Sequence, residues 1–234
     1  GILKGTLASG AKEIHQKTYF FHTSSNYRLT GWQTVSGQRY YLKPDGTAKT
    51  GWFIIGGLTY YAEPETTESG VLQGTLAKGA KEIAGETYFF HSSNNNRLTG
   101  WQTINKVRYY LQANGKAKSG WFKQNGYWYY GAENSNENLL KGAMESGIRK
   151  IDEHSYYFDG NYRLATGWKL IGGVRYFFNT DANPEKCNLL YSGPIFSGWF
   201  EFEDGGKAYI NLQGNPVTGW QTIGGKKYYF DANG

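Results

Sequence analysis

The chain has 234 residues and a formal net charge of +6; aromatic residues make up 18% of it and Gly supplies 33 positions. Its 25 basic and 19 acidic side chains are scattered rather than gathered in one stripe, which argues against nucleic acid as a partner. No apolar run approaches the length of a membrane span, and the single Cys187 cannot form an internal disulfide.

A short motif is repeated along most of the chain. Its clearest copy runs from Gly31 to Leu42, where Gly-Trp-Gln-Thr-Val and Gln-Arg-Tyr-Tyr-Leu flank Ser36-Gly37. Runs of β-branched and aromatic residues around a Gly-containing link are typical of a β-hairpin. We therefore predict two-stranded hairpins here and at the related copies that begin at Gly51, Gly100, Gly120, Gly167, Gly198 and Gly219.

A second module lacks the Trp. It starts at Gly5, returns 69 residues later at Gly74, and has a degenerate third copy at Gly142. The chain thus consists of a three-module super-repeat taken three times, plus a partial tenth module. We expect a single repeat domain over residues 1–234, with super-repeats at about 5–73, 74–141 and 142–218 and a partial one at 219–234, as a fragment of a larger protein.

One hairpin of this size is not stable alone in water. Tyr40 and Tyr41 are adjacent, so in a strand their rings point to opposite faces, and one can pack against the neighbouring module. Stability then comes from contacts between neighbours. The predicted fold is all-β, an elongated β-solenoid of stacked two-stranded β-hairpin repeats.

The repeat pattern is most disturbed between Asn179 and Ser197. This segment lengthens the module that follows Trp168 and contains Pro184 and Pro194. We expect a protruding loop or a bend at this place.

The residues do not suggest catalysis. No nucleophile, base or carboxylate pair stands outside the repeat pattern, and His22 and His91 occupy the same repeat position. The four His residues also lack the spacing of zinc ligands. We therefore predict that this chain is not an enzyme and has no catalytic residue, metal or cofactor.

Binding to a polymer fits the composition better. Aromatic rings can stack on the apolar faces of sugars, while Gln and Arg can bind hydroxyl groups. Several weak sites on one array would add up through avidity. The candidate residues in the two clearest modules are Trp32, Gln33, Arg39, Tyr41, Trp101, Gln102, Arg108 and Tyr110. The alternative is a structural stalk or spacer without a ligand, in which these rings only pack between modules.

The spacing Gly-Trp-x4-Gly-x2-Tyr-Tyr resembles the cell-wall-binding repeats of Gram-positive surface proteins. That superfamily includes choline-binding repeats, glucan-binding repeats of glucosyltransferases and the C-terminal repeats of clostridial toxins. The resemblance implies a secreted or cell-surface protein that attaches without catalysis to cell-wall polysaccharide, teichoic acid or a host or extracellular glycan. It also allows a catalytic domain on the same parent chain.

In the choline-binding repeats that this chain resembles, Gly-Trp is followed by a second Trp just before Tyr-Tyr. These rings form an aromatic box that binds a quaternary ammonium. In this chain the second Trp is mostly replaced: by Thr59 in one module and by a cation in five others, at Arg39, Arg108, Arg175, Lys207 and Lys227. The resemblance therefore favours neutral or acidic saccharides, with Gln33, Gln102 and Gln221 binding hydroxyl groups. One choline or teichoic-acid site, built from Trp121 and Trp128, remains as an alternative.

Overall fold

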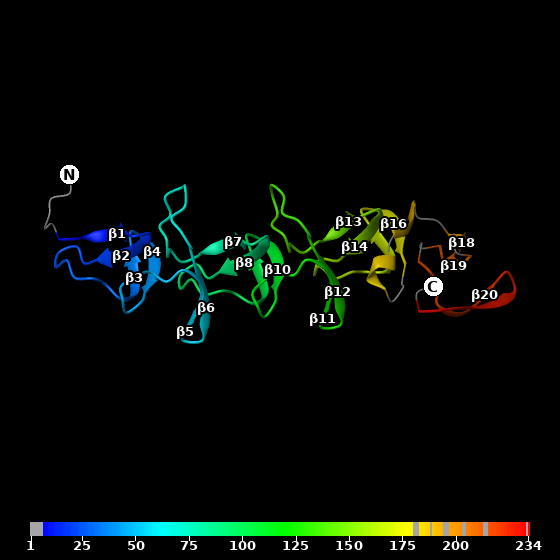
Figure 1. The fold of residues 1–234 in the computed structure, drawn as a ribbon. Helices are drawn as coiled ribbons and strands as arrows, with labels where there is room; N and C mark the ends of the chain where they lie inside the picture. Colours follow the sequence, from blue (N-terminus) through cyan, green and yellow to red (C-terminus); the bar gives the residue numbers. More distant parts are fainter. Residues whose placement is uncertain are drawn as a thin grey trace. The chain divides into compact units, whose positions relative to one another are not determined.

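The computed structural model describes residues 7–179, 183–187, 189–193, 197–202, 205–212, 215–232 and 234. These residues form antiparallel β-sheets, nine of two strands and one of three, and contain no α-helix. The chain divides into two compact units, Gly1–Lys118 and Ser119–Gly234, and within each unit hairpin follows hairpin (Figure 1). Among the described residues, no helix is long and apolar enough to cross a bilayer. The predicted all-β class is confirmed.

The first unit is a series of hairpins, each made of two consecutive strands. They are β1 (Gly10–Ile14) with β2 (Lys17–Phe21), β3 (Gly31–Val35) with β4 (Gln38–Leu42), β5 (Gly51–Ile55) with β6 (Leu58–Ala62), β7 (Gly79–Ile83) with β8 (Glu86–Phe90), and β9 (Gly100–Ile104) with β10 (Val107–Leu111).

The second unit continues the pattern and adds one strand and one 3₁₀ turn. Its elements are β11 (Gly120–Gln124) with β12 (Tyr127–Gly131), β13 (Gly147–Ile151) with β14 (His154–Phe158), β15 (Gly167–Ile171) with β16 (Val174–Phe178), η1 (Pro184–Lys186), β17 (Leu189–Gly193), β18 (Gly198–Glu201) with β19 (Lys207–Ile210), and β20 (Gly219–Ile223) with β21 (Lys226–Phe230).

The hairpin at Gly31–Leu42 has the predicted form. Trp32 lies opposite Tyr41, and Val35 lies opposite Gln38. The two linking residues, Ser36 and Gly37, have φ of 50° and 76°. Positive φ at both central residues is what a type I′ turn requires, and its twist matches that of the flanking strands. Local turn chemistry therefore sets the register of this hairpin.

The Trp-less modules are also hairpins, and their strands begin later than the repeated Gly-Thr-Leu-Ala segment. The first strands start at Gly10 and Gly79, so that Ala11 and Ala80 take the place that Trp has elsewhere. Gly74 lies before the strand, with φ of 84°, and a Cβ on it would meet the Cβ of Ala48 at 2.4 Å. A glycine is needed there because neighbouring repeats approach so closely. Gly5 lies outside the described residues.

The core runs between successive hairpins of a unit. Tyr40 is only 3% exposed and packs with Phe20, Leu42 and Ala48, whereas its neighbour Tyr41 is half-buried. Backbone hydrogen bonds also join hairpins, as where Leu76 N donates to Arg39 O at 2.9 Å. The predicted stacking is therefore confirmed within the unit, with the two Tyr of the pair on opposite faces.

Between Asn179 and Ser197, where the sequence predicts a protruding loop or a bend, the residues that the structure describes include a 3₁₀ turn and a paired strand. β17 pairs antiparallel with β16, and the register shifts between Phe177 and Phe178. The 3₁₀ turn η1 is capped by Asn183, whose Oδ1 accepts from Glu185 N at 3.1 Å. The added strand covers an edge of β16 that would otherwise present unpaired backbone groups. Pro194 lies outside the described residues.

Removal of a core ring should show how much stability one junction supplies. Phe90 is buried in a cluster with Ala77 and Tyr88, and Phe90→Ala leaves a cavity there. We expect the free energy of unfolding in urea to fall by about 3–5 kcal/mol. Ile54→Ala, at a side chain that is 64% exposed, is the control and should change it by less than about 0.5 kcal/mol. Equal losses in the two variants would contradict the location of the core.

Candidate ligand-binding site

Aromatic rings gather where one hairpin meets the next. Trp32 and Tyr41 face each other across β3 and β4, with ring centroids 5.0 Å apart and planes at 72°. Tyr60 of the following hairpin lies 5.1 Å from Trp32. The ring of Trp32 is half-buried, so one part packs against the neighbour and the rest is exposed to solvent. This edge-to-face arrangement is one that aromatic rings prefer.

A guanidinium covers the indole in the two clearest modules. Cζ of Arg39 lies 4.2 Å from the ring centroid of Trp32, and Cζ of Arg108 lies 4.6 Å from that of Trp101. Nη1 of Arg39 also donates to the backbone oxygen of Asn94 at 2.9 Å. The guanidinium therefore occupies the ring face on which a quaternary ammonium would sit.

The structure brings most of the predicted residues of these modules together. Trp32, Arg39 and Tyr41 form one group in the first unit. Trp101 and Tyr110, with ring centroids 5.0 Å apart, form another with Arg108. The sequence signal was sufficient here because paired strand positions and their diagonal neighbours share a face.

The predicted Gln residues lie elsewhere. Gln33 follows Trp32 in the strand and so points to the opposite face of the hairpin. Its Nε2 donates to Thr30 O at 2.8 Å, and Gln102 and Gln221 make the equivalent bonds to Thr99 and Thr218, also at 2.8 Å. These amides hold the segment that enters each strand, and the structure does not bring Gln33 beside the indole.

A different group of rings surrounds Trp121 in the second unit. The centroid of Trp121 lies 5.1 Å from Tyr130, 5.0 Å from Tyr156 and 5.8 Å from Phe158. Trp121, Tyr130 and Tyr156 line a pocket of about 530 Å³, which we call the Trp121 pocket. Its rim is acidic and includes Glu133, Asp152, Glu153 and Glu185.

Trp128, which the sequence pairs with Trp121, is not among the residues that line this pocket. Nζ of Lys123 lies 5.9 Å from the centroid of the Trp128 ring. The second tyrosine of the pocket comes instead from the next hairpin. Sequence reasoning missed Tyr156 because it searched for the box within one module.

The acidic rim acts on the tyrosines of the Trp121 pocket. Burial, followed by the negative charge of Glu133, raises the pKa of Tyr130 to about 12. Burial also raises the pKa of Tyr156, with Glu185 as the next cause. The same field that disfavours a phenolate favours a bound cation.

The first unit holds a matched ring cluster with an arginine beside it. The centroid of Trp52 lies 5.0 Å from Tyr61 and 4.9 Å from Tyr88. Cζ of Arg97 lies 5.9 Å from the centroid of Trp52, and Lys81 forms an ion pair with Glu63 at 2.6 Å. The rings repeat between the two clusters, whereas the charges around them do not.

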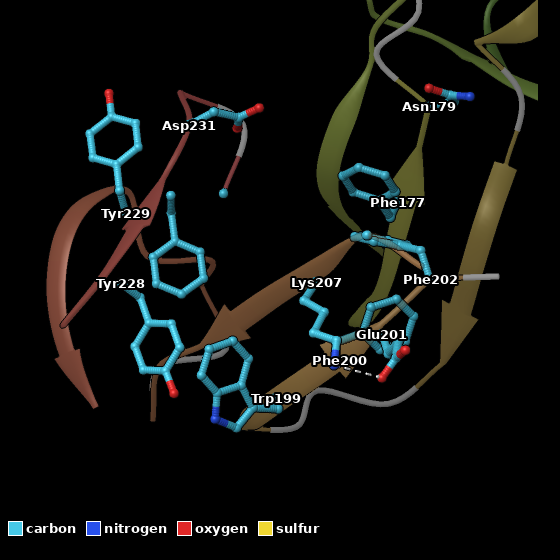
Figure 2. Close-up of a pocket in the computed structure, with 13 residues that line it drawn as sticks. Phe177, Asn179, Trp199, Phe200, Glu201, Phe202, Lys207, Tyr228, Tyr229 and Asp231 are labelled. Atoms are coloured by element: carbon cyan, nitrogen blue, oxygen red, sulfur yellow. Dashed lines mark ion pairs between the residues drawn. The ribbon is translucent and has the colours of Figure 1, made fainter. Parts of the chain in front are cut away.

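A further aromatic hollow, of about 880 Å³, lies near the end of the second unit (Figure 2). Trp199 lies beside Tyr228, with centroids 4.8 Å apart, and Phe177 and Phe202 lie across the hollow. Sequence analysis did not select these residues. The available signal was the position of Trp199, which, like Trp121, is followed by a hairpin ending in Tyr-x-Phe. Within the described residues, no group of His, Cys, Asp and Glu could hold a metal ion.

Comparison with known proteins identifies the class of module. A family described as choline-binding repeat matches residues 29–67 and 98–142. A second family, described as putative cell wall binding repeat, matches residues 166–181 and 218–234. The chain therefore belongs to the superfamily of cell-wall-binding repeats, as the sequence predicted, and is a module of binding repeats of the kind found in surface proteins.

Similar proteins share the repeats over much of the chain. Glucosyltransferase-S of Streptococcus mutans is 30% identical over 168 residues, which are 69% of this chain and 10% of that protein. Glucosyltransferase-I of Streptococcus downei is 26% identical over 243 residues, 98% of this chain and 13% of that protein. The chain thus spans only a small part of these relatives. The structure of CbpJ from Streptococcus pneumoniae has the same fold, with a TM-score of 0.57, 19% identity and coverage of 95% of this chain and 92% of that one.

The raised pKa of Tyr130 predicts how the free energy of unfolding depends on pH. Its folded value of about 12 lies above its ordinary value of 10.0, so the stabilisation is complete below pH 10 and is lost as the pH rises through about 12. We expect the unfolding free energy of the native protein to fall more steeply over this range than that of Tyr130→Phe. Glu133→Gln should lower the pKa of Tyr130, and NMR of labelled tyrosine measures that pKa. An unchanged pKa would exclude Glu133 as a cause.

Proposed function

We propose that this chain is a non-catalytic module that binds a saccharide polymer outside the cell. The polymer would be a cell-wall polysaccharide, teichoic acid or another extracellular glycan, and the module would belong to a longer secreted or cell-surface protein. The observation that carries the proposal is the half-buried Trp under an Arg guanidinium, present at Trp32 and again at Trp101.

The chemistry of this pair suits a saccharide. The exposed part of the indole offers an apolar surface for the C–H face of a sugar ring, while the guanidinium offers N–H donors for hydroxyl, carboxylate or phosphate oxygens. Because the cation already covers the ring of Trp32, a quaternary ammonium would have to displace it. The names of the two relatives, both glucosyltransferases, support a saccharide as the ligand class.

Repetition explains how shallow sites could hold a polymer. Trp32 and Trp101 are only half-buried, so each contact with a sugar would be weak. Sites on one chain that engage the same polymer gain effective concentration, and the overall affinity exceeds that of each site. We keep a single repeat domain over residues 1–234 as part of this proposal. Any catalytic activity would reside in another domain of the parent protein.

Removal of both guanidinium groups should weaken binding and leave the rings in place. For Arg39→Gln/Arg108→Gln we expect affinity for teichoic acid, measured by co-sedimentation, to fall at least about tenfold, since each charge-assisted hydrogen bond contributes about 1.5–3 kcal/mol. Loss of affinity for neutral glucan should be smaller.

The matched control for that experiment is Lys12→Gln/Lys78→Gln. It removes the same charge from exposed positions in Trp-less modules and should retain binding. If the native chain binds no glucan, teichoic acid or peptidoglycan, the proposal fails and the module is a stalk. If both double variants lose affinity equally, net charge rather than the Arg–Trp pair is responsible.

A second candidate function is recognition of choline at the Trp121 pocket. Trp121, Tyr130 and Tyr156 supply three rings, and the rim supplies carboxylates. This combination suits a quaternary ammonium because cation–π attraction and the negative field act together. Tyr156, from the next hairpin, is the ring that the sequence alone did not indicate, and it supports this alternative.

Choline titration tests this alternative directly. We expect choline at tens of millimolar to change the Trp fluorescence of the native protein, and Trp121→Phe to remove most of that change. Trp52→Phe is the control, because its ring cluster has the same form but lies next to Arg97 and should not bind the cation. No response in the native protein, or a response that depends on Trp52, would exclude the Trp121 pocket.

A further inference from the structure

Arg175 on β16 is the one charged residue that the described part of the chain buries, with 4% of its surface exposed. It occupies the repeat position of Arg39, and its Cζ lies 5.9 Å from the ring centroid of Trp168. Arg39, in contrast, is half-buried. Because guanidinium groups stay protonated in proteins, Arg175 carries its positive charge into the interior.

This charge is poorly compensated. Nη2 of Arg175 donates to Oδ1 of Asn215 at 3.4 Å, which is long for a hydrogen bond. Its Nε is buried and has no acceptor, and no ion pair with Arg175 is found among the described residues. Arg39, by comparison, donates to a backbone oxygen at 2.9 Å. A buried charge without an opposite charge beside it is unfavourable, so the arrangement is one that an anion would complete.

A pocket lies beside this guanidinium. It has a volume of about 360 Å³ and is lined by Thr166, Trp168, Arg175 and Asn215, among others. Among the described residues, no Asp or Glu lines it. The described lining thus offers hydroxyl, amide and guanidinium groups together with an aromatic ring, and no carboxylate that would repel an anion. This differs from the Trp121 pocket, whose rim is acidic.

We propose that the pocket beside Arg175 binds an oxyanion, a phosphate or a carboxylate, carried by the polymer. The planar guanidinium can bind either group through two parallel N–H···O bonds. In the second unit the anion would then neutralise the buried charge. The inference rests on the proposed function in one respect only: that function supplies the polymer that would carry the anion. The site itself follows from the burial and poor compensation of Arg175.

The first test uses the unmodified protein and small anions. Inorganic phosphate and glucuronate are titrated at constant ionic strength while the Nε–Hε resonance of Arg175 is followed by NMR, with glucose as the neutral control. We expect a saturable shift of this resonance with one or both anions and none with glucose. Phosphate alone would indicate a phosphodiester polymer, and glucuronate alone an acidic sugar. No shift with either anion would overturn the proposal.

The second test uses two variants and the melting temperature. Arg175→Met removes the buried charge, and Lys227→Gln removes an exposed charge at the same repeat position. Phosphate or glucuronate should raise the melting temperature of the native protein and of Lys227→Gln by the same amount, and should leave Arg175→Met unchanged. Equal stabilisation of all three proteins would show a general salt effect and refute the site. An unfolded Arg175→Met variant would leave the NMR titration to decide.

The two proposals can fail separately. A chain that binds no polymer but shows the anion shift would retain the Arg175 site without the proposed function. A chain that binds neutral glucan through its Arg–Trp pairs but shows no anion shift would retain the function and lose the Arg175 site.

Discussion

The whole architecture depends on the inability of one two-stranded hairpin to bury its own apolar face. Each hairpin has a single layer, so Tyr40 and Leu42 reach full burial only against rings from the adjacent hairpin. Aromatic residues suit this arrangement because a large ring spans the gap between two layers with few side chains. Stability is therefore shared between neighbours, and each hairpin is both a folded element and part of the next one's core.

This constraint links packing to function. Trp32, Trp52 and Trp121 each contact the next hairpin of the same unit, yet each of these rings stays partly exposed. The rings that hold two hairpins together are thus also the surface that a ligand meets. What varies between junctions is charge: Arg39 covers Trp32, whereas carboxylates surround Trp121. One scaffold can in this way present sites of different ligand preference.

The Trp-less hairpins contribute to that variation. They place Ala11 and Ala80 where other hairpins have Trp, but they retain the aromatic second strand. Tyr88 from such a strand completes the ring cluster of Trp52, and Tyr156 completes that of Trp121. A module that lacks the signature residue is therefore still needed to build the neighbouring site, which is why sites are properties of pairs of modules.

The sequence alone determined the hairpins, their register and the family, because these depend on local features: alternating strand residues, the Ser36-Gly37 turn and the Gly-Trp spacing. It also placed Arg39 beside Trp32, since the hairpin register makes these two residues diagonal neighbours on one face. Only the tertiary structure decided that β17 joins β16, that Glu185 reaches the Trp121 pocket, and that Arg175 is buried while Arg39 is not. Such features depend on which distant segments come together, and a residue's own position in the repeat does not encode that proximity.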